Sequence, residues 1–135
     1  MKEGGNAKTK VDITVTVRVD SGGNSNGWEQ VTVNGTTYEY KFTGGSMGGG
    51  NHTAKLNTGE NVLDIALKDH EDRYSIASVT LDPPSPQFVP SVENEYLAHI
   101  DDANTAEAQT TYTVNVQDAQ NGNSIPCHPM LQNRP

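Results

Sequence analysis

Four histidines and one cysteine are the side chains best suited to bind a metal, and their spacing predicts no metal site. The histidines are His52, His70, His99 and His128. None of them lies three or four residues from another histidine or from Cys127, whereas zinc sites are usually built from pairs at such short spacings. Cys127 and His128 are adjacent, and adjacent strand side chains point to opposite faces. The sequence therefore predicts scattered surface histidines, no metal and no cofactor.

Acidic side chains gather where a corner of the fold is expected, and they could in principle bind calcium. The four candidates are Asp69, Glu71, Asp72 and Asp82, and the pair Asp101-Asp102 is a weaker candidate. Calcium binds several hard oxygen ligands at one point, and loops of β-sandwich proteins can supply them. However, the chain contains no D-x-D-x-D-G loop, and His70 and Arg73 interrupt the run of acids. We therefore expect a solvated, charged corner rather than a calcium site.

The patterns that mark common catalytic sites are missing from the sequence. Glycoside hydrolysis needs two carboxyl groups across a cleft, and nothing singles out such a pair among the 17 acidic residues. The chain has no G-x-S-x-G around an exposed serine. The glycine-rich residues 44–50 lack the pattern of a phosphate-binding loop, and a mobile hairpin or lid is expected there. We therefore predict that the protein is not an enzyme, and a hydrolase is only the third interpretation.

Aromatic side chains give the best indication of ligand binding, because their faces can stack on sugar rings. Trp28, Tyr38 and Tyr40 lie on the two strands of a predicted hairpin. A two-residue turn pairs Val31 with Tyr38 and places both tyrosines on the face of Val31 and Val33, which favours a role in the core. Trp28, the only tryptophan, begins its strand on the opposite face. Trp28 is therefore the candidate contact for a carbohydrate.

The strand around which these residues must be arranged is Lys10–Asp20. Apolar residues occupy every second position from Val11 to Val19, and polar residues occupy the positions between them. Because successive strand side chains point to opposite faces, this pattern predicts a long strand with one buried and one exposed face. The predicted hairpin follows it, since Asn34-Gly35 suits a type I′ turn whose twist matches that of the strands.

Further alternating segments predict the remaining strands, and no segment is a convincing helix. Inward-facing residues are expected at Leu63, Ile65, Leu67, Ala77, Val79, Leu81, Tyr112, Val114 and Val116. Short strands are also expected around Ala54 and within residues 92–100, whereas residues 21–27 read as a polar loop. The proline-rich residues 82–90 should form an extended crossover or a sheet edge, because proline cannot donate to a sheet ladder.

This pattern of about seven to eight short antiparallel strands, separated by turns, is typical of an immunoglobulin-like β-sandwich. A barrel or a jelly roll would also satisfy it. We expect a single all-β domain spanning residues 1–135. Within it, residues 1–9 are expected to be a flexible lead-in and residues 125–135 a proline-containing tail.

The composition limits the classes of partner. The net charge is −8 and the 9 basic residues form no cluster, which argues against binding a nucleic acid backbone. No stretch approaches the roughly 20 apolar residues of a membrane helix, and the N-terminus lacks the apolar region of a secretory signal. The sequence therefore predicts an acidic, cytoplasmic protein. Hydrophobic residues make up only 33% of the chain, so we expect a small core. Formation of a homo-oligomer would bury further apolar surface and is therefore expected to stabilise the protein.

The last part of the chain combines a strand, YTVNVQD, a glycine-containing turn and the segment IPCHPMLQNRP. This arrangement resembles the end of the small bacterial DP-EP family, in which Cys-Asp-Pro is followed shortly by Asn-Glu-Pro. The matching residues are Ile125, Cys127, Pro129, Asn133 and Pro135, over roughly the last quarter of the chain. His128 and Arg134 stand in place of the two acidic signature residues. The resemblance implies a compact all-β domain of uncharacterised function, with no catalytic residues to transfer.

We therefore interpret the chain as a non-enzymatic structural or interaction module that associates with copies of itself. The chain is also similar to inclusion-body-type bacterial β-sandwich proteins, which are known mainly as abundant assemblies. Its tail could lie across a neighbouring subunit, and the candidate interaction residues are Cys127, His128, Pro129, Asn133 and Pro135. The alternative function is a small carbohydrate-binding module that uses Trp28. Loss of glycan binding in Trp28→Ala would favour this second function.

Overall fold

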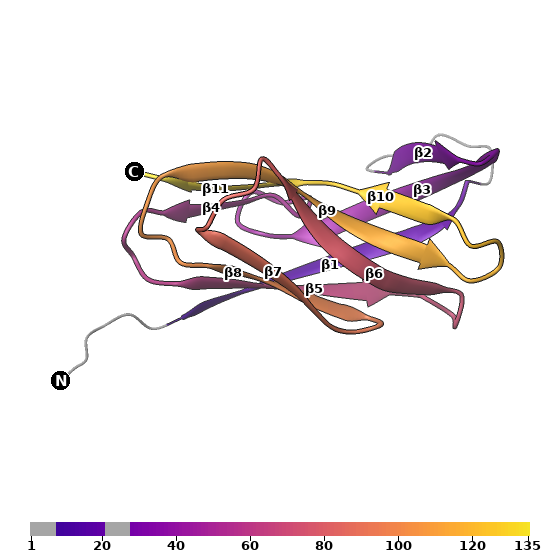
Figure 1. Ribbon diagram of the computed structural model, residues 1–135, viewed down its shortest axis with the longest axis horizontal. Helices are drawn as coiled ribbons and strands as arrows, with labels where there is room; N and C mark the ends of the chain where they lie inside the picture. The colour runs from indigo at the N-terminus through magenta and orange to yellow at the C-terminus, as the bar shows by residue number, and fades with distance from the viewer. Residues whose placement is uncertain (1–7, 21–27) are drawn as a thin grey trace.

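The computed structural model describes residues 8–20 and 28–135, which form eleven strands in two sheets (Figure 1). The strands are β1 (Thr9–Val19), β2 (Glu29–Val33), β3 (Thr36–Gly44), β4 (His52–Lys55), β5 (Asn61–Lys68), β6 (Tyr74–Asp82), β7 (Phe88–Asn94), β8 (Leu97–Asp102), β9 (Ala108–Asp118), β10 (Ser124–Cys127) and β11 (Met130–Arg134). Within these ranges no helix is long and apolar enough to cross a membrane. The predicted all-β, sandwich-like fold is confirmed.

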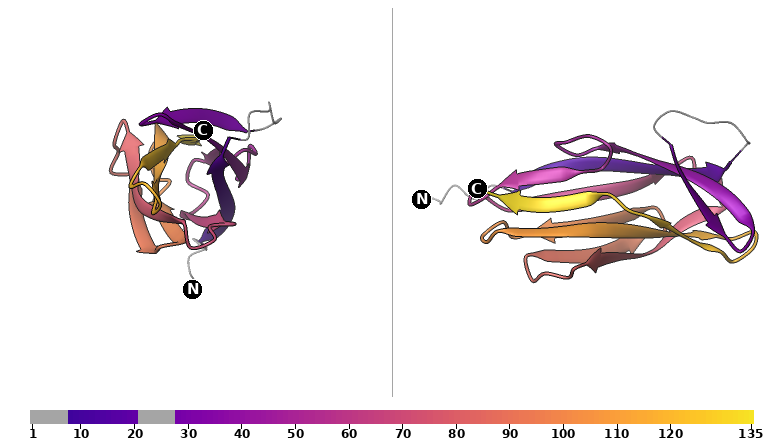
Figure 2. Two further views of the ribbon diagram at one scale, coloured as in Figure 1. Left: turned by 90° about the vertical axis from the view of Figure 1, so that its right-hand side faces the viewer. Right: turned by 90° about the horizontal axis from the view of Figure 1, so that it is seen from above.

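The strands of the first sheet are ordered β2-β3-β1-β5-β8-β7, and β9 organises the second sheet. One side of β9 pairs with β6, the other side pairs with β10 and then β11, and β4 pairs with β11. Viewed along the long axis of the molecule, the strands surround a common interior (Figure 2, left). Both sheets therefore contribute to one core.

The predicted number and direction of strands were partly wrong. Eleven strands replace the seven or eight expected, because the tail forms β10 and β11 and because residues 88–102 form the hairpin β7–β8 rather than one strand. Two strand pairs, β1–β5 and β4–β11, are parallel, so both sheets are mixed rather than antiparallel. Parallel neighbours are not consecutive in sequence, and local alternation carries no information about them.

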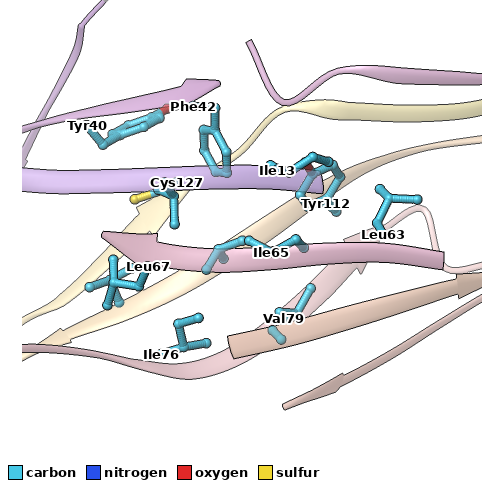
Figure 3. Close-up of a cluster of buried hydrophobic side chains, with 14 of the residues drawn as sticks. Ile13, Tyr40, Phe42, Leu63, Ile65, Leu67, Ile76, Val79, Tyr112 and Cys127 are labelled. Carbon is cyan, nitrogen blue, oxygen red and sulfur yellow. The ribbon is translucent and has the colours of Figure 1, made fainter. Parts of the chain in front are cut away.

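The alternating valines predicted the core face of β1 correctly as far as Val17. Val11, Ile13, Val15 and Val17 are all buried, but Val19 is 40% exposed. The predicted inward residues of β5 and β9 are also confirmed, since Leu63, Ile65, Leu67, Tyr112, Val114 and Val116 are buried. Figure 3 shows part of this core, in which Ile13, Leu63, Ile65, Leu67 and Tyr112 gather below Tyr40 and Phe42.

The hairpin β2–β3 has the predicted register, in which Val31 pairs with Tyr38. Its turn residues, Asn34 and Gly35, have φ angles of 49° and 83°, as a type I′ turn requires. Tyr38 is fully buried and Tyr40 is 7% exposed, so both belong to the core. Residues 44–50 form an ordered turn rather than a mobile lid, since the amide of Gly50 donates to the carbonyl of Gly44.

The predicted face of β6 was wrong in its first half. The pairing of β6 with β9 shifts between Ile76 and Ser78, which is a β-bulge. A bulge inserts one residue and reverses the alternation, so Ile76 and Val79 both point inward while Ala77 is exposed. Leu81 is half-buried, as expected for its end of the strand.

The C-terminal tail is part of the molecule's own second sheet. Pro126 of β10 pairs with Asn115 of β9, and Leu131 of β11 lies fully buried in the core. At the other end of the chain Thr9 already belongs to β1, so the expected lead-in of residues 1–9 is too long. The rest of that segment and the expected loop 21–27 lie outside the described residues.

Candidate functional site

A surface groove of about 400 Å³ contains the only tryptophan of the chain. Its walls are the last residues of β1, from Thr16 to Val19, together with Trp28 and the corner Asp69–Tyr74. These segments meet because β1 and β5 run parallel, with Thr16 opposite Lys68. The corner that follows β5 is therefore carried to the end of β1. We call this feature the Trp28 groove.

Trp28 is held in the groove by a stacked arginine. The guanidinium carbon of Arg18 lies 3.7 Å from the centroid of the indole ring, which is a cation–π contact. Arg18 also forms an ion pair with Glu39, whose side chain is only 1% exposed. A buried carboxylate thus fixes the guanidinium, and the guanidinium fixes the half-buried indole. Trp28 directly precedes β2 and is not part of the hydrophobic core cluster.

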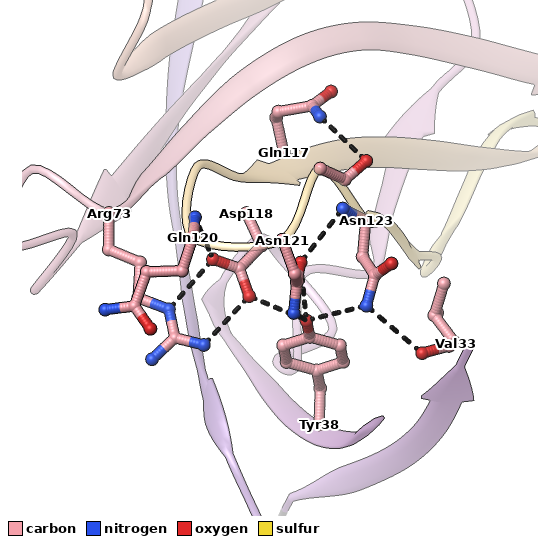
Figure 4. A network of polar contacts seen from close by, with 9 residues as sticks. Val33, Tyr38, Arg73, Gln117, Asp118, Gln120, Asn121 and Asn123 are labelled. Atoms are coloured by element: carbon pink, nitrogen blue, oxygen red, sulfur yellow. Dashed lines mark hydrogen bonds and ion pairs between the residues drawn. The ribbon is translucent and has the colours of Figure 1, made fainter. Parts of the chain in front are cut away.

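The opposite wall of the groove is anchored by a second arginine. Arg73 donates from Nε and Nη2 to the two carboxylate oxygens of Asp118, at 2.9 Å each (Figure 4). This fork holds the pKa of Asp118 at about 2, below its ordinary value, and raises the pKa of Arg73. The guanidinium also lies 5.1 Å from the ring of Tyr74, which lines the same groove. The position of Arg73 is therefore fixed by its partners.

Asp118 belongs to a buried network that ties the hairpin β2–β3 to the end of β9. The hydroxyl of Tyr38 donates to Asp118 at 2.6 Å, while the side-chain amides of Asn121 and Asn123 donate to that hydroxyl at 2.9 and 3.1 Å (Figure 4). The amide of Asn123 also donates to the carbonyl of Val33. Connected and satisfied networks of this kind rigidify the elements that they join. The Trp28 groove therefore lies at a stiff end of the molecule.

The acidic corner does not bring all four predicted residues together. Asp69 and Glu71 are exposed and line the Trp28 groove. Asp82 ends β6, a strand that begins at Tyr74, so about 25 Å separates Asp82 from the corner. Among the described residues no group of three or more His, Cys, Asp or Glu side chains could hold a metal ion. The corner is thus a source of hydrogen-bond acceptors for the groove.

Two of the histidines have structural roles. His52 is 6% exposed and bonds to the side chain of Asn61 through Nε2 at 2.9 Å, so it is buried rather than on the surface as predicted. The ring of His70 stacks on that of Tyr96, with 3.6 Å between centroids. Both rings are committed to contacts within the chain.

His99 lies between two carboxylates on the outer face of the first sheet. Nδ1 is 2.6 Å from Asp64, Nε2 is 2.6 Å from Glu93, and these carboxylates raise the pKa of His99, with Glu93 the larger cause. Strand pairing also places Ser91 opposite His99, which puts serine, histidine and aspartate on three adjacent strands. In a hydrolase the histidine Nε2 must face the serine, but here it faces Glu93. The arrangement is an ion-paired surface cluster that sequence reasoning missed, because the strand order was needed to find it.

Most of the predicted tail residues face the chain's own interior. Cys127 is fully buried, burial raises its pKa, and both Pro129 and Asn133 are buried as well. Only His128 and Pro135 are exposed. The tail thus offers a partner two of the five candidate residues.

Comparison with protein-family models and with curated proteins finds no match to this chain. The resemblance of residues 125–135 to the DP-EP family stays a prediction that these comparisons do not test.

Proposed function

We propose that this protein is a non-catalytic module that binds a saccharide in the Trp28 groove. The observation that best supports the proposal is the lone tryptophan, stacked on an arginine, in a groove that two exposed carboxylates also line. Aromatic faces stack on sugar rings. Carboxylates accept hydrogen bonds from the hydroxyl groups around such a ring. The groove combines both kinds of contact.

Each groove residue has a role in this proposal. Trp28 supplies the stacking surface, and Asp69 and Glu71 accept hydrogen bonds from sugar hydroxyls. Arg18 holds the indole in one orientation, which limits the side-chain entropy lost on binding. Because both carboxylates are exposed rather than held in a dry cleft, the arrangement favours binding over glycoside hydrolysis.

A binding assay on immobilised polysaccharides tests the proposal. The wild-type protein should be retarded by at least one member of a panel of glucans, xylans, mannans and chitin oligosaccharides. Trp28→Ala should abolish the retardation and Asp69→Asn should weaken it. Asp101→Asn, on β8 outside the groove, should leave the retardation unchanged. Equal retardation of all four proteins would place binding elsewhere, and no retardation of the wild type would contradict saccharide binding.

Self-association is a second candidate function, and a different surface from the tail supports it. β7 is an edge strand of the first sheet, with Val89 56% exposed and Val92 39% exposed. Beside it lies an apolar surface groove of about 600 Å³, to which Leu81 and Phe88 contribute. Exposed apolar surface at a sheet edge is a common place for contact between subunits.

Light scattering separates these two functions. If the β7 edge joins copies of the chain, the wild type should have a mass of at least a dimer, and Val89→Lys should give a monomer. The exposed substitution Thr111→Lys, on β9, is the matched control and should keep the wild-type mass. Removal of residues 125–135 is not a clean test, because it deletes β11 and exposes the core.

A further inference from the structure

Three buried side chains meet at the end of the molecule opposite the Trp28 groove. They are Asp102 at the end of β8, Asn104 in the following loop and Asn133 in β11, and they are 0%, 1% and 1% exposed. Each has one oxygen that lacks a hydrogen-bond partner within the described ranges: Oδ2 of Asp102, Oδ1 of Asn104 and Oδ1 of Asn133. Buried polar atoms without partners are rare in folded proteins, and a bound water molecule or ion is a common partner for them.

The other atoms of these side chains are firmly held. Oδ1 of Asp102 accepts from the side-chain amide of Asn133 at 2.8 Å and from the backbone amide of Asn104 at 3.0 Å. The side-chain amide of Asn104 donates to the carbonyls of Lys55 and Gly59, at 2.7 and 3.0 Å. Rotating either carboxamide by 180° would turn its oxygen toward another acceptor. The contacts therefore define all three unpartnered atoms as oxygens.

The charge of Asp102 has no counterion in the described part of the chain. The ring of His52 lies in the same region, where its Nδ1 accepts from the amide of Ser46 at 3.3 Å and its Nε2 lies 2.9 Å from the side-chain oxygen of Asn61. The other carboxylate near this region, that of Glu60, is paired with Lys8 at 3.9 Å.

The three unpartnered oxygens are all hydrogen-bond acceptors, and this limits the kind of ligand that could satisfy them. A single water molecule can donate only two hydrogen bonds, so it would leave one oxygen unsatisfied. A metal cation, unlike a water molecule, can accept more than two such oxygens as ligands. Carboxylate and amide oxygens are the ligands that calcium prefers, and calcium tolerates irregular geometry and added water ligands.

We propose that Asp102, Asn104 and Asn133 supply ligand oxygens to a calcium-type cation site. The route to it is a surface pocket of about 570 Å³, which Asn104 and Glu60 both line. With one carboxylate among its three ligands, the site should be weak, with a dissociation constant of about 0.1 to 1 mM. A bound cation would link the first sheet, through Asp102, to the last strand of the second sheet.

Calorimetry on the intact chain tests this proposal. After EDTA treatment and transfer into potassium chloride buffer, calcium chloride titrated to about 10 mM should bind with one site per chain. Calcium should also raise the thermal midpoint, while equal magnesium chloride should raise it much less. Asp102→Asn should weaken calcium binding at least about tenfold, because it removes the only charged ligand. Asp101→Asn, next to it in β8, should bind as the wild type does.

The stability of Asp102→Asn without calcium shows whether that variant is a fair test. Its oxygen can still accept from Asn133, and its new amide can donate to one of the unpartnered oxygens. It should therefore melt at or above the temperature of calcium-free wild type. Absence of calcium binding by the wild type would overturn the proposal and favour an internal water or a protonated carboxyl. Unchanged calcium binding by a folded Asp102→Asn would overturn it as well.

Discussion

The side-chain amide of Asn133 donates to the carboxylate of Asp102 at 2.8 Å, and these two buried residues come from opposite sheets. Asn133 is one of the residues that carry the resemblance to the DP-EP family. The contact gives that position a physical role, since it fixes the last strand to the end of β8. At the other end of the molecule, Tyr38 and Asp118 join the sheets in the same way. At each end of the core, a buried hydrogen bond between side chains thus connects the two sheets.

Loss of the Asn133 contact should destabilise the fold. In Asn133→Leu the Asp102 carboxylate loses one of its two donors while remaining buried, which should lower the free energy of unfolding by about 1–3 kcal/mol. Urea denaturation of calcium-free protein measures this directly. Arg134→Gln, at the exposed neighbouring position, should change the value by no more than about 0.5 kcal/mol. Equal stability of Asn133→Leu and wild type would show that the contact is dispensable.

Acid should weaken the protein through Asp118. The fork from Arg73 lowers its pKa in the folded state to about 2 from the ordinary 3.8. A lowered folded pKa stabilises above the ordinary pKa, and that stabilisation is lost as the pH falls from about 4 towards 2. The loss should be on the order of 2 kcal/mol. Unfolding free energies at several pH values in this window should fall more steeply for wild type than for Asp118→Asn, and parallel curves would contradict the assignment.

The sequence predicted those features of the fold that depend on residues close together in the chain, and it missed those that depend on the pairing of distant strands. The alternation of β1 as far as Val17 and the Asn34-Gly35 turn act within a few residues, and both predictions were confirmed. The bulge at Ile76 was not visible, because it is a response to the partner strand β9. Pro126 suggested a loose tail, yet it fits in β10 because β10 is an edge strand and needs no amide on its open side.

The candidate site was predictable in part. Residue type and strand alternation singled out Trp28 as a candidate contact, and the structure places it half-buried outside the core cluster. Its neighbours were hidden, because Asp69 reaches the groove through the parallel pairing of β1 with β5, and Arg18 reaches Trp28 across the intervening strand β3. The oxygen cluster around Asp102 was hidden for the same reason, since its ligands come from both sheets.

Alkali should remove a stabilising contribution from His99. Glu93 and, to a lesser extent, Asp64 raise its pKa, so the contribution is fully present below the ordinary value of about 6.5. It is lost as the pH rises through the raised pKa of the folded state. NMR titration of the His99 ring in Glu93→Gln should show a lower pKa than in the wild type. Glu95→Gln, in the adjacent turn, should titrate as the wild type does, and an unshifted His99 in Glu93→Gln would contradict the pairing.

Two glycines with similar φ angles should respond differently to alanine. Gly44 (φ 91°) would place its Cβ 2.2 Å from the carbonyl oxygen of Asp12, whereas Gly35 (φ 83°) has nothing within 4 Å. Gly35→Ala therefore costs only backbone strain, about 1 kcal/mol. Gly44→Ala adds a backbone clash and should cost more than about 3 kcal/mol. Urea denaturation measures both, and equal losses would show that the β1–β3 ladder yields easily at this point.

Fluorescence of the single tryptophan is the most direct measure of the Trp28 groove. Titration of the wild-type protein with the saccharide retained best on the immobilised panel should change the emission of Trp28 along a saturable curve. Asp69→Asn should keep the same unbound spectrum but shift the midpoint to higher saccharide concentration, since it removes an acceptor charge without altering the indole. A spectrum that does not respond to any saccharide of the panel would contradict saccharide binding at this groove.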